Sequence, residues 1–142
     1  MAHTIAIFGA SGDLTGRKLI PALYELFRKG RLPENTRVVG FSRTPFSHDA
    51  WRAKLAESTP GFVGEDFDAE VWHRFAPSIF YHPGDADSVE DVAALGGFLD
   101  ELEAGVETDR VYYLSVAPQL YATAAAHLGA AGMTADDRGP RR

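Results

Sequence analysis

A run of small residues, Gly9-Ala10-Ser11-Gly12-Asp13-Leu14, lies between a short apolar segment, Thr4–Phe8, and a segment with helical spacing. Small side chains let a ligand approach the backbone closely, and the free amides at a helix start attract anionic oxygens. The chemistry offered here is the binding of a pyrophosphate. The G-x-x-G spacing also fits an ordinary strand-to-helix turn. The preceding strand and the following helix favour a dinucleotide.

Arg43 follows the second apolar segment, Val38–Phe41, and is flanked by Ser42 and Thr44. NAD sites usually place Asp or Glu near the end of this strand to bind ribose hydroxyls, whereas NADP sites offer a cation to the 2′-phosphate. No acidic residue occurs here before position 49. Most arginines are simply exposed to solvent. At this position, however, a guanidinium can hold the 2′-phosphate through two hydrogen bonds, which favours NADP.

Two further loops are expected at the carboxyl ends of strands. Asp85 and Ala86 follow the third apolar segment, and Val116, Ala117 and Pro118 end the fourth. Open parallel sheets bind ligands outside these strand ends, so we expect both loops to line the same cleft, although either could be a plain connection. The five histidines have no close metal-ligand spacing, and no metal site is predicted.

The elements that must position these residues alternate between strands and helices. Strands are predicted at Thr4–Phe8, Val38–Phe41, Ile79–His82 and Val111–Val116, and helices over Asp13–Lys29 with a kink at Pro21, after Ser47, after Asp68, after Ser88 and after Pro118. Pro60-Gly61 and Gly64 are expected to separate the second and third helices. The alternation predicts an α/β fold, a Rossmann-like doubly wound parallel sheet that is incomplete at its C-terminal end. Residues 1–133 form this domain, and the tail, residues 134–142, has no pattern of a further strand.

Composition narrows the function classes. A chain of 142 residues predicts one domain. With 14 basic and 20 acidic residues its formal net charge is −6, which argues against nucleic-acid binding. There is no cysteine, no apolar run of membrane-spanning length and no basic leader before the first apolar segment. We therefore expect a cytoplasmic protein.

Two motifs resemble the glucose-6-phosphate dehydrogenase family. Residues 7–23, IFGASGDLTGRKLIPAL, resemble its opening segment, and residues 112–118, YYLSVAP, resemble its Y-L-(A/S)-x-x-P segment. The resemblance implies oxidation of glucose 6-phosphate to 6-phosphogluconolactone with NADP⁺, the first step of the oxidative pentose phosphate pathway, by a homo-oligomeric enzyme.

The resemblance also assigns roles. It implies that residues 9–14 hold the pyrophosphate and Arg43 the 2′-phosphate. Asp85 and Ala86 would approach the adenosine half, and residues 116–118 would line the nicotinamide side. Lys18 would lie near the substrate phosphate.

The family's next strand, its E-K-P-F-G segment and its α+β domain with a catalytic His-Asp pair are not found in this sequence. We therefore expect no catalytic residue in this chain, and glucose 6-phosphate as a partner of the full-length enzyme only. The tail is expected to diverge from the family, as in a truncated or frameshifted frame. One alternative is a stand-alone nucleotide-binding fragment without activity. A short-chain dehydrogenase is a weaker alternative, because no Y-x-x-x-K pair is present.

Overall fold

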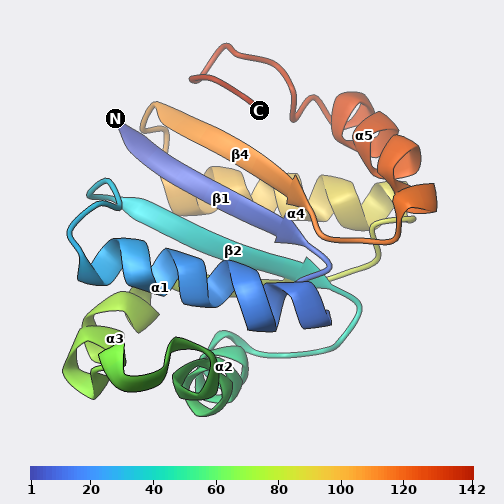
Figure 1. Cartoon of the computed structure of the whole chain (residues 1–142). Coiled ribbons are helices and arrows are strands. Elements are labelled where there is room, and N and C mark those ends of the chain that lie inside the picture. The colour runs from blue at the N-terminus through green and yellow to red at the C-terminus, as the bar shows by residue number, and fades with distance from the viewer.

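The computed structural model describes all 142 residues as an alternation of strands and helices (Figure 1). In chain order these are β1 (Ala2–Phe8), the π-helical turn η1 (Thr15–Leu19), α1 (Ile20–Arg28), β2 (Thr36–Ser42), α2 (His48–Val63), η2 (Gly64–Asp66), α3 (Ala69–Phe75), η3 (Ala76–Ser78), β3 (Ile79–Pro83), α4 (Val89–Glu103), β4 (Thr108–Leu114), η4 (Pro118–Leu120) and α5 (Tyr121–Ala130).

The four strands form one parallel sheet in the order β3-β2-β1-β4. This confirms the predicted α/β class and the doubly wound parallel sheet. Phe8 at the end of β1 is in register with Phe41 of β2 and Leu114 of β4. Three strands therefore end side by side, and the loops that follow them begin at the same edge of the sheet.

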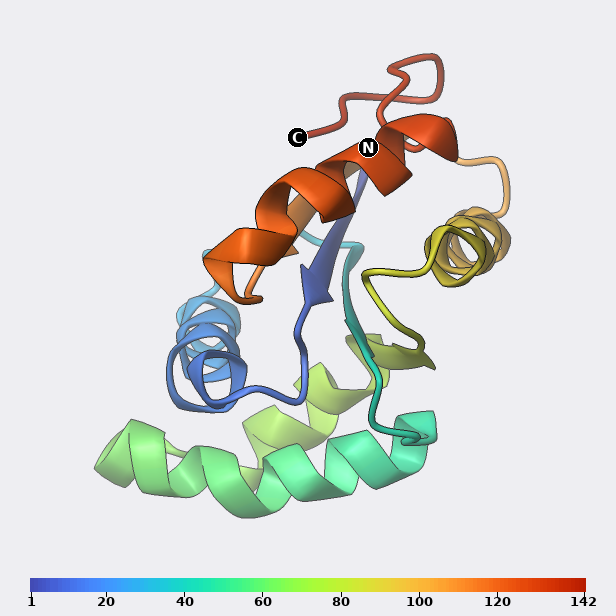
Figure 2. The same cartoon turned by 90° about the vertical axis from the view of Figure 1, so that its right-hand side faces the viewer.

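Helices cover both faces of the sheet, and each face has its own core. One core joins α1, α2 and α3 to the sheet and includes Ile20, Trp51 and Phe75. The other joins α4 and α5 to the opposite face and includes Leu95 and Leu128. Figure 2 shows α1 and α4 on opposite sides of the sheet. Burying these apolar faces is the main stabilising contribution to such a fold.

The helix after the glycine-rich turn differs from the continuous helix predicted over residues 13–29. It opens with the π-helical turn η1, in which the Ile20 amide bonds the Thr15 carbonyl, and Pro21 lies in the first turn of α1. Proline has no N–H to donate, so the wider turn falls where the regular hydrogen-bond ladder would be interrupted.

The predicted break at Pro60-Gly61 is wrong, because both residues lie inside α2. Trp51, Leu55 and Thr59 are buried four residues apart along this helix, and their packing outweighs the local preference of Pro and Gly. Helices do begin after Ser47, Asp68 and Ser88 as predicted, and each of these side chains accepts a hydrogen bond from an amide in the first turn.

The tail forms no assigned strand, yet it lies along the outer edge of β4. The amides of Thr108, Arg110 and Tyr112 donate to carbonyls of Arg138, Pro140 and Arg142, and the Arg142 amide donates back to the Arg110 carbonyl. The edge of β4 is thus paired over its first half, although the polar tail sequence gives no strand signal.

Candidate functional site

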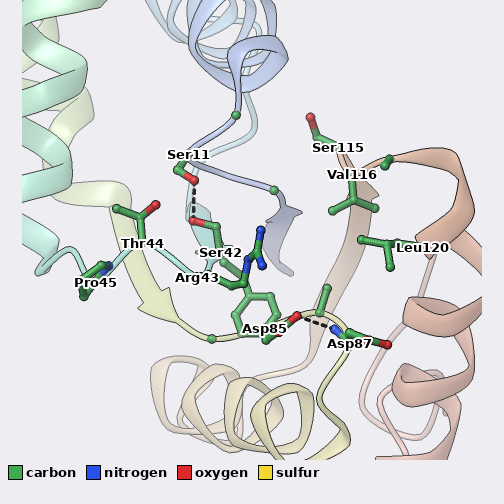
Figure 3. Close-up of a pocket in the computed structure, with 16 residues that line it drawn as sticks. Ser11, Ser42, Arg43, Thr44, Pro45, Asp85, Asp87, Ser115, Val116 and Leu120 are labelled. Atoms are coloured by element: carbon green, nitrogen blue, oxygen red, sulfur yellow. Dashed lines mark hydrogen bonds between the residues drawn. The ribbon is translucent and has the colours of Figure 1, made fainter.

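A cleft of about 790 Å³ opens at the carboxyl ends of the strands (Figure 3). This volume is typical of small-molecule sites. Its walls are the four loops that follow the strands, and its lining comprises Gly9, Ser11, Gly12, Phe41, Ser42, Arg43, Thr44, Pro45, Gly84, Asp85, Ala86, Asp87, Ser115, Val116, Ala117 and Leu120.

The loop after β1 requires glycine at position 9. Gly9 has a φ of +85°, and a Cβ atom there would lie 1.9 Å from the Ser115 carbonyl oxygen. The Gly9 amide donates to the Phe41 carbonyl at 2.9 Å, and the Gly12 amide donates back to the Gly9 carbonyl. The amides of Ser11, Asp13 and Leu14 donate to no backbone carbonyl. These free donors at a helix start can bind an anion.

Thr15 holds the loop after β1 through a buried side chain. Its side chain is fully buried, and its hydroxyl donates to the Gly9 carbonyl at 3.2 Å. The Ser115 amide donates to the Phe8 carbonyl at 2.8 Å, which brings the end of β4 against the same turn. The sequence gives no signal for this role, because a threonine in a helical segment is usually exposed.

The loop after β2 presents Arg43 to the cleft. The Arg43 side chain is exposed, extends into the cleft in Figure 3 and makes no hydrogen bond or ion pair within the chain. The hydroxyl oxygens of Ser42 and Ser11 lie 3.0 Å apart and share a hydrogen bond, so the first two loops are joined. A free guanidinium beside several hydroxyl groups is a set of donors suited to a phosphate.

The loop after β3 is held by Asp91 of α4. The Asp85 amide donates to the Asp91 carboxylate at 2.9 Å, and the Asp87 amide donates to the Asp85 carboxylate at 2.9 Å. The Asp91 side chain therefore holds this loop, while the Asp91 amide donates to the Ser88 hydroxyl at the start of α4. A Cβ atom on Gly84 would lie 2.5 Å from the Phe41 ring, so this loop also needs a glycine.

The structure brings most of the predicted cofactor residues into one cleft. Eight of them line it, namely Gly9, Ser11, Gly12, Arg43, Asp85, Ala86, Val116 and Ala117. Four do not: Ala10 is buried, Asp13 is exposed and bonded to Arg17, Leu14 is exposed, and Pro118 begins η4. Lys18, predicted for the substrate phosphate, is exposed and also lies outside the cleft lining.

Sequence reasoning named neither Asp87, Ser115 nor Leu120 as site residues, although all three line the cleft. Asp87 and Ser115 each adjoin a predicted pair, so a wider window at the strand ends would have included them. Leu120 lies in η4, a position without a motif of its own. No group of three or more His, Cys, Asp or Glu side chains is placed to hold a metal ion.

Residues 6–142 match the family model described as "Glucose-6-phosphate dehydrogenase, NAD binding domain". The chain belongs to this family. The match includes the tail, residues 134–142. Membership indicates a nicotinamide dinucleotide as the cofactor class.

Curated relatives support the same family. Glucose-6-phosphate 1-dehydrogenase of Chlamydia muridarum is 39% identical over 120 residues, which are 82% of this chain and 24% of the relative. The enzyme of Aggregatibacter actinomycetemcomitans is 39% identical over 140 residues, 97% of this chain and 28% of the relative. A chloroplastic enzyme of Arabidopsis thaliana is 36% identical over 119 residues, 83% of this chain and 21% of the relative. The chain spans about a quarter of the length of these relatives.

Solved structures of the family share the fold. A glucose-6-phosphate dehydrogenase in complex with its substrate glucose-6-phosphate superposes with a TM-score of 0.83 at 32% identity, covering 99% of this chain and 29% of that one. Glucose-6-phosphate 1-dehydrogenase of Mycobacterium avium gives 0.82 at 25% identity, with the same coverage of both chains. None of the helices here has the length and apolar character needed to cross a membrane.

The residues present fit a dinucleotide. Free amides at the start of η1, hydroxyl groups on two adjoining loops and an unpaired guanidinium are donors for phosphate groups. The apolar residues Val116, Ala117 and Leu120 on the opposite wall can pack against a ring. The site therefore combines an anion-binding end with an apolar one, as a dinucleotide requires.

Proposed function

We propose that this chain is the NADP-binding part of a glucose-6-phosphate dehydrogenase, which oxidises glucose 6-phosphate to 6-phosphogluconolactone with NADP⁺. The family and the names of its relatives support the reaction. The observation that supports NADP over NAD is Arg43, an unpaired cation at the carboxyl end of β2 with no acidic residue beside it.

Each loop has a part in this proposal. The turn of residues 9–14 holds the pyrophosphate on its free amides, and Arg43 holds the 2′-phosphate with help from the neighbouring hydroxyls. Asp85 and Ala86 contact the adenosine half, and residues 116–118 line the nicotinamide half. Lys18, which lies outside the cleft lining, is proposed for the substrate phosphate of the complete enzyme. Bound NADP⁺ supplies the hydride acceptor, and we assign no catalytic base to this chain.

The first test is calorimetric titration of this chain with NADP⁺ and NAD⁺, before and after Arg43→Ala. We expect the substitution to weaken NADP⁺ binding by about 1.5–3 kcal/mol, because a charge-assisted contact is lost, and NAD⁺ binding much less. Arg74→Ala, which removes an exposed arginine on α3, is the matched control. If Arg43→Ala weakened the binding of both cofactors equally, the assignment of NADP would be rejected.

The second test is an assay of glucose 6-phosphate oxidation. We expect turnover only where these residues are joined to a domain that supplies a base, since proton removal from the sugar hydroxyl needs one within hydrogen-bond reach. Turnover by these 142 residues alone would place a base within this chain. Cofactor binding that never leads to turnover, even with such a domain joined, would favour the inactive nucleotide-binding fragment.

A further inference from the structure

Tyr81 of β3 lies directly behind the loop that presents Arg43. Its side chain is 2% exposed, and its ring packs against Trp51 and Phe46 at centroid distances of 5.2 and 5.4 Å. The phenol oxygen meets two residues of the loop at three atoms. It lies 2.6 Å from the Thr44 carbonyl oxygen and 3.2 Å from the Ser42 carbonyl oxygen, and it also bonds the Ser42 hydroxyl.

Proton counting gives these bonds a direction. A phenol has one proton, and a carbonyl oxygen can only accept. Tyr81 therefore donates to the Thr44 carbonyl. Its oxygen also shares a hydrogen bond with the Ser42 hydroxyl, which in turn bonds Ser11 in the glycine-rich turn. Both neighbours of Arg43 in the chain are thus tied to one buried atom.

The other bond to the Thr44 carbonyl is local, from the amide of Phe46 two residues later. The phenol is the tether that reaches this carbonyl from a different element, 37 residues along the chain. A loop held by its own short-range bonds can rotate as a unit, whereas a bond to a buried strand residue fixes it relative to the sheet. The Gly84 amide already holds the Ser42 carbonyl at 2.8 Å, so the phenol is the bond that fixes the Thr44 side of Arg43 relative to the sheet.

The phenol stays protonated at neutral pH. Burial raises the pKa of Tyr81 above its ordinary value of 10, and the hydrogen bond with Ser42 only partly offsets this effect. The donor to the Thr44 carbonyl is therefore present under the conditions of a binding measurement.

We propose that Tyr81 is a positioning residue that sets the preference for NADP⁺ by holding Arg43 toward the 2′-phosphate. The inference rests on the proposed function, because it needs Arg43 to bind that group. Tyr81 does not line the cleft, so it acts through the loop and not by direct contact.

Tyr24 offers a matched comparison for a purely structural role. It is fully buried, its hydroxyl donates to the Asp68 carbonyl at 3.1 Å, and it accepts from the Asp68 amide at 2.8 Å. These contacts join α1 to the start of α3 and do not involve the cleft. Tyr24→Phe and Tyr81→Phe remove the same group from equally buried sites.

The test is a double-mutant cycle on the full 142-residue chain, with NADP⁺ and NAD⁺ affinities measured by calorimetry. We expect Tyr81→Phe to weaken NADP⁺ binding about five- to tenfold and NAD⁺ binding less than twofold, as for the loss of one hydrogen bond acting through Arg43. In the Arg43→Ala background, Tyr81→Phe should leave the ratio of the NADP⁺ and NAD⁺ affinities unchanged. Tyr24→Phe should lower the melting temperature without changing the ratio of the two affinities.

Two results would overturn the role of Tyr81. One is a selectivity ratio unchanged by Tyr81→Phe, and the other is an effect of the same size with and without Arg43. Failure of the proposed function is a separate outcome, because Arg43→Ala alone would then weaken the binding of NADP⁺ and of NAD⁺ equally. If Tyr81→Phe does not unfold cooperatively, Phe46→Leu, which removes a ring packed against Tyr81 and does not line the cleft, takes its place in the same cycle with the same two results.

Discussion

At Gly9 the backbone has a φ of +85° and passes so close to β4 that a Cβ atom would lie 1.9 Å from the Ser115 carbonyl oxygen. Gly9→Ala must therefore shift either the turn or the end of β4, and both line the cleft. We expect the free energy of unfolding to fall by about 2–4 kcal/mol, from steric overlap and left-handed strain, and dinucleotide binding to be lost. Urea denaturation and calorimetry measure the two effects.

Gly16→Ala is the control for this prediction. Gly16 lies in η1, seven residues later, where a Cβ atom meets nothing within 4 Å. Removing a helical glycine there should change stability by no more than about 1 kcal/mol and leave binding intact. Comparable affinities of the two alanine variants would show that the turn tolerates a side chain at position 9.

Residue roles could be predicted only where they depend on local sequence. Gly9 was predictable because a strand, a glycine and a helix follow one another directly in the chain. Tyr81 was not, because in the apolar segment of residues 79–82 it has the pattern of a core residue, and its partners lie 37 and 39 residues away. Thr15 was missed for the same reason, since its burial depends on how the turn meets β4.

At the scale of elements, α2 protects the free edge of the sheet. β3 is an edge strand, and its outward groups are bonded by side chains from the first turns of α2. The Tyr81 amide donates to His48 Nδ1 at 2.8 Å, and Arg52 Nε donates to the Ile79 carbonyl at 2.7 Å. Unpaired strand edges favour association with other chains, so these two side chains take the place of a neighbouring strand.

This arrangement predicts a loss of stability in mild acid. Burial lowers the pKa of His48, and also that of His82, below the ordinary value of 6.5. The unfolded chain therefore binds more protons than the folded chain as the pH falls through 6.5, and the free energy of unfolding decreases. Protonated Nδ1 would also face the Tyr81 amide as a second donor. Urea denaturation between pH 7.5 and 5.5 should show the decrease.

His48→Asn separates the histidine effect from other titrations. Its amide oxygen can accept from the Tyr81 amide without titrating, so we expect the decrease between pH 7.5 and 5.5 to become smaller. His73→Asn replaces an exposed histidine on α3 and should keep the full decrease. A decrease of the same size in both variants would contradict the assignment to His48.

Element order was predictable and element boundaries were not. Continuous apolar segments identify buried parallel strands, because both faces are covered. β4, however, begins at Thr108, three residues before the predicted start, since polar Thr108, Asp109 and Arg110 are buried in bonded contacts. A pattern of apolar residues cannot reveal a strand whose buried side chains are charged and paired.

The whole molecule separates its ligand cleft from its most buried ion pair. The cleft lies at the carboxyl ends of the strands. Near the amino ends of β1 and β4, the Arg110 guanidinium bonds Glu103 at 2.6 Å and Asp100 at 2.7 Å, and the Thr4 hydroxyl donates to Glu103 at 3.1 Å. Burial alone would lower the pKa of Arg110, but the bonds to Glu103, Tyr112 and Asp100 outweigh it and raise the pKa.

Removing one partner of this pair should destabilise the fold without altering the cleft. Glu103→Leu leaves the Arg110 guanidinium, whose side chain is 3% exposed, without its main partner. We expect a loss of about 3–5 kcal/mol in the free energy of unfolding, and recovery of most of it in Glu103→Leu/Arg110→Met, because two apolar side chains then replace a buried charge. Urea denaturation measures both.

Cofactor affinity decides whether the two ends of the molecule are independent. Calorimetry on the double variant, under conditions where it is folded, should give the parent affinity for NADP⁺, since none of the substituted residues lines the cleft. Asp13→Asn is the exposed comparison for the buried pair: it breaks the bond with Arg17 and should change the free energy of unfolding by less than about 0.5 kcal/mol. If the double variant regained stability but lost affinity, the charged pair would contribute to shaping the loops through β1 and β4, and the separation proposed here would be wrong.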